Sequence, residues 1–173
     1  MHADEELTSI PVPRSLAERR AYARDRLETG FQMWLATGSD GHGAHLIPVA
    51  YAWDGSALYT ATFVKSRTVA NIKAHPQARV ALGDTANVIM IDTSASLMDV
   101  PDIGAGIAEH YARVSTDPRT YPEGTFVYLR LQPRRIQVWN GFHEFVGRTV
   151  MRDGRWLDNP VDWHAVRPES HRG

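Results

Sequence analysis

The spacing of hydrophobic and polar positions along the chain changes at Gly30. Before this residue, four apolar side chains recur at helical spacing: Leu16, Ala17, Ala21 and Leu27. Ser15 and Glu18 form the Ser-x-x-Glu pattern of a helix capping box, and a glycine is a common helix stop. We therefore expect a helix over about 15–28. Its thin apolar stripe predicts that it lies over the core at the surface.

After Gly30, apolar, β-rich runs separated by turn signals indicate β-strands. The expected strands cover residues 31–37, 44–53, 57–63, 78–82, 87–91, 125–131 and 135–139. The first three are expected to form an antiparallel meander, because short Gly-containing turns join them. Pro48 cannot donate a ladder hydrogen bond, so its strand should be at an edge, bulged or open to a ligand. Pro133 is expected to separate the last two strands.

Two further helices and one tight turn are predicted between and after these strands. Residues 66–75 have helical spacing, with Ser66 near the N-cap and Pro76 after the end. Residues 102–114 are also expected to be helical, although they contain two glycines. Asp153-Gly154 is predicted at the tip of a tight turn.

About seven short strands with few helices predict a mostly β protein with peripheral helices. We expect a closed or partly closed antiparallel barrel, because closure removes exposed strand edges. The predicted organisation is an N-terminal arm and helix (1–30), one barrel domain (31–156) and an irregular C-terminal arm (157–173). A chain of 173 residues suits one domain that buries roughly 70% of its unfolded surface.

Composition narrows the range of functions. The chain has no cysteine, which excludes disulfides, thiol nucleophiles and thiolate metal sites. Its net charge of -1 provides no basic field for nucleic acid, so a small ligand is expected. The start is acidic and polar, and no run approaches the ~20 apolar residues of a membrane span. We therefore expect a cytoplasmic protein with no membrane partner.

Candidate chemistry centres on Lys65, Ser66, Arg67 and Thr68, at the junction of a strand and a helix start. Free backbone N–H groups, the positive end of the helix dipole, two cations and two hydroxyls would converge there on a phosphate. The alternative interpretation is a solvated turn with an ordinary helix cap.

Other candidate sites have weaker support. Trp139, Trp156 and Tyr59 either line a flat aromatic pocket or belong to the core, where large aromatic side chains are more often found. His42 and His45 flank a hairpin without a third ligand nearby, so no metal site is expected. The chain contains no Gly-rich dinucleotide motif, phosphate loop or G-x-S-x-G turn, so hydrolase chemistry has no sequence support.

Several short segments follow one another in a characteristic order. They are Trp34-Leu-Ala-Thr, Ile47-Pro-Val, Trp53-Asp-Gly, Leu58-Tyr-Thr-Ala-Thr, Ser66-Arg-Thr-Val-Ala-Asn-Ile and Pro76-Gln-Ala-Arg-Val-Ala-Leu82. The ordered set resembles the pyridoxamine 5'-phosphate oxidase-like superfamily of FMN-binding split barrels, over most of residues 31–156. The resemblance implies a split antiparallel β-barrel of Greek-key type.

The resemblance also implies a cofactor site in which Ser66, Arg67 and Thr68 hold the flavin phosphate. The full set of expected cofactor-binding residues is Lys65, Ser66, Arg67, Thr68, Thr62, Tyr59, Pro48, Val49, Asn87, Trp139 and Arg148. Members that oxidise pyridoxamine phosphate commonly have lysines where this chain has Thr68 and near Val49. They also have an Arg-x-His that grips the substrate phosphate, where this chain has Glu144-Phe-Val-Gly147.

These features predict an oxidoreductase, but not a true pyridoxamine phosphate oxidase. Bound FMN, or a deazaflavin of the F-420 type, would carry the hydride, and no side chain is expected to act as acid or base. The acidic and apolar segment 144–147 favours a neutral or cationic acceptor, aromatic ones included. A groove between two barrels implies a homodimer. The alternatives are a non-catalytic binder of flavin, haem or another tetrapyrrole, and a dimerisation module with an empty groove.

Overall fold

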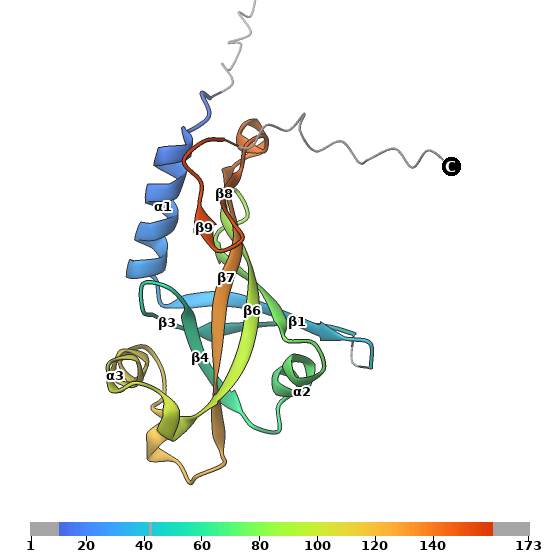
Figure 1. Ribbon diagram of the computed structural model, residues 1–173, viewed down its shortest axis with the longest axis vertical. Coiled ribbons are helices and arrows are strands. Elements are labelled where there is room, and N and C mark those ends of the chain that lie inside the picture. The colour runs from blue at the N-terminus through green and yellow to red at the C-terminus, as the bar shows by residue number, and fades with distance from the viewer. Residues whose placement is uncertain (1–10, 42, 161–173) are drawn as a thin grey trace, which may run out of the picture.

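The computed structural model describes residues 11–41 and 43–160, which form one curled antiparallel sheet with helices around it (Figure 1). The strands in this part of the chain are β1 (Gln32–Ser39), β2 (Gly43–Ala50), β3 (Ala52–Trp53), β4 (Leu58–Phe63), β5 (Gln77–Gly83), β6 (Asn87–Asp99), β7 (Phe126–Asn140), β8 (Thr149–Arg152) and β9 (Arg155–Trp156). The α-helices are α1 (Leu16–Thr29), α2 (Arg67–Ala74) and α3 (Ala105–Val114), and the short 3-10 helices are η1 (Val100–Asp102), η2 (Pro118–Thr120) and η3 (Phe142–Glu144).

The order of strands explains why the sheet curls into a partly closed barrel. The order is β2-β1-β5-β6-β7-β4-β3, with β8 and β9 attached to β7. β2 and β3 are joined directly through Tyr51, yet they occupy opposite ends of this order. The two edges of the sheet must therefore approach each other, as the predicted split barrel requires. Pro48 lies on the edge strand β2, which confirms one of the placements expected for it.

Both antiparallel hairpins expected among the first three strands are present, but they do not form one continuous meander. The predicted strand over 44–53 divides at Tyr51: its first part pairs with β1, and its last two residues pair with β4. The Tyr51 side chain is fully buried, and its hydroxyl donates to the carbonyl of Arg26 at 2.9 Å, near the end of α1. This buried contact holds the corner at which the chain passes from one sheet edge to the other.

The predicted break at Pro133 is also wrong, because β7 is continuous for 15 residues. The pairing with β6 shifts between Asp92, opposite Arg135, and Thr93, opposite Pro133. Arg134 is therefore the extra residue of a β-bulge, a position at which a strand accommodates proline. The expected strand over 87–91 is correspondingly too short, since β6 continues beside β7 to Asp99.

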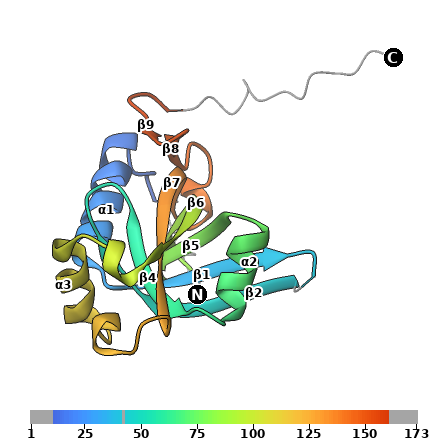
Figure 2. The same ribbon diagram turned by 60° about the horizontal axis from the view of Figure 1, so that its bottom comes forward.

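The helices lie where the apolar faces of the sheet need covering. α3 packs against the outer side of β3 and β4, whereas α2 contacts β1, β4 and β6 (Figure 2). The capping box of α1 is confirmed, with Ser15 and Glu18 each accepting the other's backbone N–H. The tight turn is confirmed as well, since Asp153 and Gly154 both have positive φ (52° and 74°). Among the described residues, no helix is long and apolar enough to cross a membrane.

Candidate functional site

The start of α2 presents hydrogen-bond donors to an anion. β4 ends at Phe63, and α2 begins at Arg67 after a short turn. Ser66 is the N-cap, and its Oγ accepts the N–H of Val69 at 3.2 Å. The N–H groups of Arg67 and Thr68 have no partner within the helix, because the first turn of a helix lacks preceding carbonyls. These groups and the helix dipole favour a bound anion here.

Some of the side chains predicted to bind the phosphate are exposed beside this helix start, and others are buried. Lys65 and Arg67 are exposed, and Nη2 of Arg67 lies 3.5 Å from the carbonyl oxygen of Ala44 on β2. Thr62 is half-buried near the end of β4. Thr68 is 1% exposed, so its side chain lies inside the molecule and not at the surface beside Lys65 and Arg67.

The three aromatic side chains considered as one flat pocket lie in separate places. Tyr59 is buried under α3, and its hydroxyl donates to Asp54 Oδ2 at 2.9 Å and accepts from Arg130 at 3.1 Å. Trp156 packs against the barrel core. Trp139 lies beside Phe145, with ring centroids 6.2 Å apart. They do not form a common pocket, and packing explains Tyr59 and Trp156.

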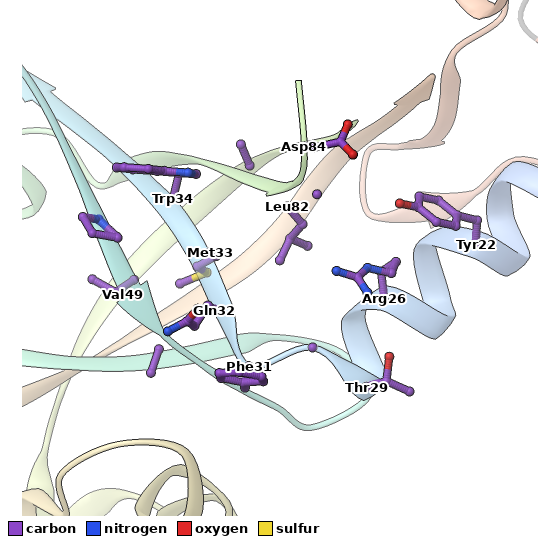
Figure 3. A pocket seen from close by; sticks show the side chains of 15 residues that line it. Tyr22, Arg26, Thr29, Phe31, Gln32, Met33, Trp34, Val49, Leu82 and Asp84 are labelled. Carbon is purple, nitrogen blue, oxygen red and sulfur yellow. The ribbon is translucent and has the colours of Figure 1, made fainter. Parts of the chain in front are cut away.

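Pro48 and Val49 line a cavity of about 850 Å³ between α1 and the β1–β2 edge (Figure 3). Arg26 extends from α1 into this space, and Trp34 lies on its β1 side. Pro48 is four residues along β2 from Ala44, whose carbonyl contacts Arg67. This spacing corresponds to about 13 Å of strand. The edge strand β2 thus connects the α2 start with this cavity.

Asn87, Trp139 and Arg148 form a second group at the other end of β6 and β7. Asn87 begins β6, and its neighbour Val88 pairs with Trp139. The guanidinium carbon of Arg148 lies 3.7 Å from the ring centroid of Phe145 and 5.9 Å from that of Trp139. Burial, followed by the charge of a neighbouring arginine, lowers the pKa of Arg148.

Glu144 is buried in the loop over 141–147, next to this second group, and its carboxylate anchors that loop. Its side chain is 1% exposed and accepts hydrogen bonds from Arg14 Nη2 at 2.7 Å, from Arg14 N at 2.8 Å and from Asn140 N at 2.7 Å. Nη2 of Arg14 also donates to Asn87 Oδ1 at 3.0 Å. Burial opposes ionisation of Glu144, but these hydrogen bonds outweigh it and lower the pKa to about 2.

This geometry corrects one expectation from the sequence. Glu144 faces Arg14 inside the molecule, so it gives no support for a cationic acceptor. Its neighbours Phe145 and Val146 are 39% and 67% exposed, so the apolar part of the segment is what a ligand would meet. No sequence pattern pointed to Arg14, which directly precedes the cap of α1 and contacts a partner 130 residues away.

The two groups of predicted residues do not meet within one chain. Thr62, beside the α2 start, pairs with Val127 near the beginning of β7, whereas Trp139 lies 12 residues further along that strand. Twelve strand residues span about 40 Å. A ligand that touches both groups therefore needs a second copy of the chain to supply one of them.

A row of mostly apolar residues crosses the outer face of the sheet between these groups. Residues that pair across antiparallel strands lie on the same face. The paired row runs Pro48, Trp34, Ala81, Met90 and Gln137. Trp34 is 48% exposed and the neighbouring Leu46 is 60% exposed, whereas Leu35 points into the core. Such a patch of exposed apolar side chains is typical of an interaction surface.

The described residues contain no cluster of three or more potential metal ligands. His45 is half-buried on β2, and His42, its predicted neighbour in a hairpin, lies outside the described residues.

Comparison with known proteins places this geometry in a family. The family model described as pyridoxamine 5'-phosphate oxidase matches residues 21–140. A comparison with curated protein sequences gave no match. The fold is similar to that of an F420 reductase, with a TM-score of 0.53 and 21% identity over 65% of this chain and 94% of the other.

Two mycobacterial structures are also similar in fold. One is the conserved hypothetical protein Rv2991 from Mycobacterium tuberculosis, with a TM-score of 0.59 and 20% identity over 75% of this chain and 86% of that protein. The other is a heme binding protein from Mycobacterium smegmatis, with a TM-score of 0.58 and 19% identity over 83% of this chain and 60% of that one. The family match covers more than half of the chain, and the predicted split barrel is confirmed. The chain belongs to the pyridoxamine 5'-phosphate oxidase family.

Proposed function

We propose that this protein is an oxidoreductase that binds FMN, or alternatively a deazaflavin of the F-420 type, and transfers a hydride to a small acceptor other than pyridoxamine phosphate. The observation that carries the proposal is the separation of two groups of candidate cofactor residues in a chain of this family. They lie about 40 Å apart along β7, a distance that a homodimer would bridge by uniting one group from each copy.

The start of α2 fits the phosphate of such a cofactor. Lys65 and Arg67 are exposed cations beside unpaired N–H groups of the first helical turn. Neither side chain forms an ion pair with another described residue. A phosphate dianion needs this combination of charge and directed donors. Arg67 supplies the planar fork, and Lys65 supplies a point charge.

The outer face of β1, β2 and β5 is the proposed dimer surface. Its exposed Trp34 and Leu46 would lose contact with water on association, which is favourable by about 25 cal/mol per Å² of apolar surface. In a twofold dimer, Arg67 of one copy would be placed with Trp139 and Arg148 of the partner. The cofactor would supply the redox chemistry. The side chains would bind, orient and exclude water.

Phosphate recognition is tested by titrating FMN and coenzyme F420 into the wild type and into Arg67→Ala and Arg67→Lys. Arg67→Ala should weaken binding by about 1.5–3 kcal/mol, the range for hydrogen bonds to charged groups. Arg67→Lys should recover part of this loss, since it keeps the charge but not the fork. Arg152→Ala, which removes another exposed arginine, is the control. Unchanged affinity in both Arg67 variants would remove this residue from the site.

The dimer surface is tested by analytical ultracentrifugation of Leu46→Glu, with Val12→Glu as the control at another exposed apolar position. The wild type should sediment as a dimer at micromolar concentration, and Leu46→Glu should shift it toward monomer. A monomeric wild type would overturn the shared site.

Turnover separates the enzyme from a binding protein. The bound cofactor is first treated with a reduced nicotinamide or deazaflavin donor, and a quinone is then added. Reduction by the donor followed by reoxidation by the quinone would support the oxidoreductase. Two similar structures are named as haem proteins, so haem belongs in the same titration. A Soret band that forms with haem, together with no binding of FMN or F420, would replace the proposal with haem binding.

A further inference from the structure

A second cavity is formed around the start of α3 and the start of β7. Figures 1 and 2 both show these two elements near each other. The cavity has a volume of about 780 Å³ and is formed by η1, the start of α3, η2 and the loop that leads into β7. Pockets that bind small molecules typically have volumes of about 300–1,000 Å³. None of the residues named for the proposed cofactor site lines it.

The walls of this cavity are apolar and partly aromatic. Its apolar and aromatic lining includes Val100, Pro101, Ile103, Tyr121, Pro122 and Phe126. Tyr121 is 44% exposed and contacts Phe126 edge-on, with ring centroids 5.0 Å apart. Phe126 stacks in turn on Phe63, with centroids 4.6 Å apart. These aromatic contacts fix the wall in place and leave Tyr121 open to a ligand.

The rim of the cavity is acidic. Asp99, Asp102 and Glu123 are exposed, and none of them forms an ion pair with another described residue. The one cation of the lining, Arg119, is held by Asp117 through paired contacts of 2.9 Å. Its charge is therefore already balanced.

One lysine lies close to part of this rim. Lys73 lines a neighbouring hollow together with Asp99 and Asp102, although it forms an ion pair with neither of them. Glu123 lines only the larger cavity. The negative charge of Glu123 therefore faces this cavity and not the hollow that Lys73 lines.

We propose that this cavity is a second ligand site, for a small organic cation with a flat aromatic body. The apolar walls exclude water from the body of such a ligand, and the face of Tyr121 attracts a positive charge through its quadrupole. The three carboxylates favour cations and repel anions at the entrance. This inference does not depend on the cofactor, because the cavity is complete within one chain.

The test uses three fluorescent probes of similar shape at pH 8: N-methylacridinium as the cation, acridine as the neutral compound and anthracene-9-carboxylate as the anion. Affinity should decrease in that order, and added salt should weaken the cation alone. Tyr121→Ala should weaken N-methylacridinium about tenfold, whereas Tyr121→Phe, which keeps the aromatic face, should retain most of the affinity.

The rim is tested by Glu123→Gln. This change should weaken the cation about threefold at low salt and leave acridine unaffected. Asp25→Asn, an exposed acid on α1, is the matched control and should change nothing. Arg67→Ala should also leave all three probes unaffected, so failure of the proposed cofactor site is distinguishable from failure of this one.

Three results would overturn the proposal. They are equal or stronger binding of the anion, no binding of the cation below about 1 mM, and loss of cation binding in Trp34→Ala rather than in Tyr121→Ala. The last result would place the probe on the outer sheet face.

Discussion

Replacing Glu144 by glutamine tests the buried ion pair that holds the loop over 141–147. The change keeps the volume of the side chain but removes its charge, while Arg14 keeps its donors. The pKa of Glu144 is lowered from 4.5 to about 2 in the folded protein. A difference of 2.5 between the folded and unfolded pKa is worth about 3.4 kcal/mol of stability at pH 7. Glu144→Gln should therefore unfold at lower urea concentration than the wild type.

The pH dependence identifies the cause. Because the folded pKa is the lower one, the contribution of Glu144 is present above pH 4.5 and is lost as the pH falls through 2. The stability difference between wild type and variant should therefore shrink from about 3.4 kcal/mol at pH 7 to about 1.4 kcal/mol at pH 3.

Urea denaturation followed by tryptophan fluorescence measures both values, with Glu28→Gln, an exposed acid on α1, as the control. A difference below about 0.5 kcal/mol at pH 7, the scale of surface substitutions, would refute the reasoning. So would a difference that stays the same at pH 3.

Two further predictions concern stability. The fully buried hydroxyl of Tyr128 has no hydrogen-bond partner among the described residues, so Tyr128→Phe should leave stability at pH 7 equal or raise it by up to about 2 kcal/mol. Burial raises the pKa of Tyr128 from 10.0 to about 12. The stability that its neutral form contributes is therefore complete below pH 10 and is lost as the pH rises through 12, so the variant should lose about 1.4 kcal/mol less than the wild type between pH 7 and 11. Urea curves at pH 7 and 11 check both statements, and a loss above about 1 kcal/mol at pH 7 would indicate a hydrogen bond that the structure lacks. Gly83 has φ of +86°, and a Cβ there would lie 2.3 Å from the carbonyl oxygen of Asn87. Gly83→Ala should therefore lower the free energy of unfolding by at least about 1–3 kcal/mol. Gly41→Ala, with open space around it, is the control, and an unchanged urea midpoint of Gly83→Ala would contradict the backbone geometry.

The sequence predicted local features well because the signals for them are local. Helix caps and turns depend on neighbours a few residues apart, as at Ser15, Ser66 and Asp153-Gly154. The alternation of apolar residues likewise located most of the strands. The start of α2 followed from the local pattern between Ser66 and Pro76, and the family resemblance followed from the order of several such segments.

Pairing and long-range contacts could not be predicted in the same way. The division of 44–53 at Tyr51 depends on where the barrel closes, and the continuity of β7 through Pro133 depends on a bulge that only the pairing with β6 reveals. Glu144 was interpreted as part of a ligand surface because its partner, Arg14, lies far away in sequence. The separation of Thr62 from Trp139 follows from strand length, which the sequence underestimated for both β6 and β7.

The contact between Arg14 and Glu144 also affects how the protein should be trimmed for expression. The family match begins at residue 21, so a fragment cut at that boundary would lack Arg14 and the first turn of α1. Glu144 would then be a buried carboxylate without its guanidinium, a change that typically costs about 3–5 kcal/mol. Such a fragment could fail to fold or to bind cofactor for a reason unrelated to the barrel. Fragments intended for crystallisation or binding assays should therefore start at or before residue 11.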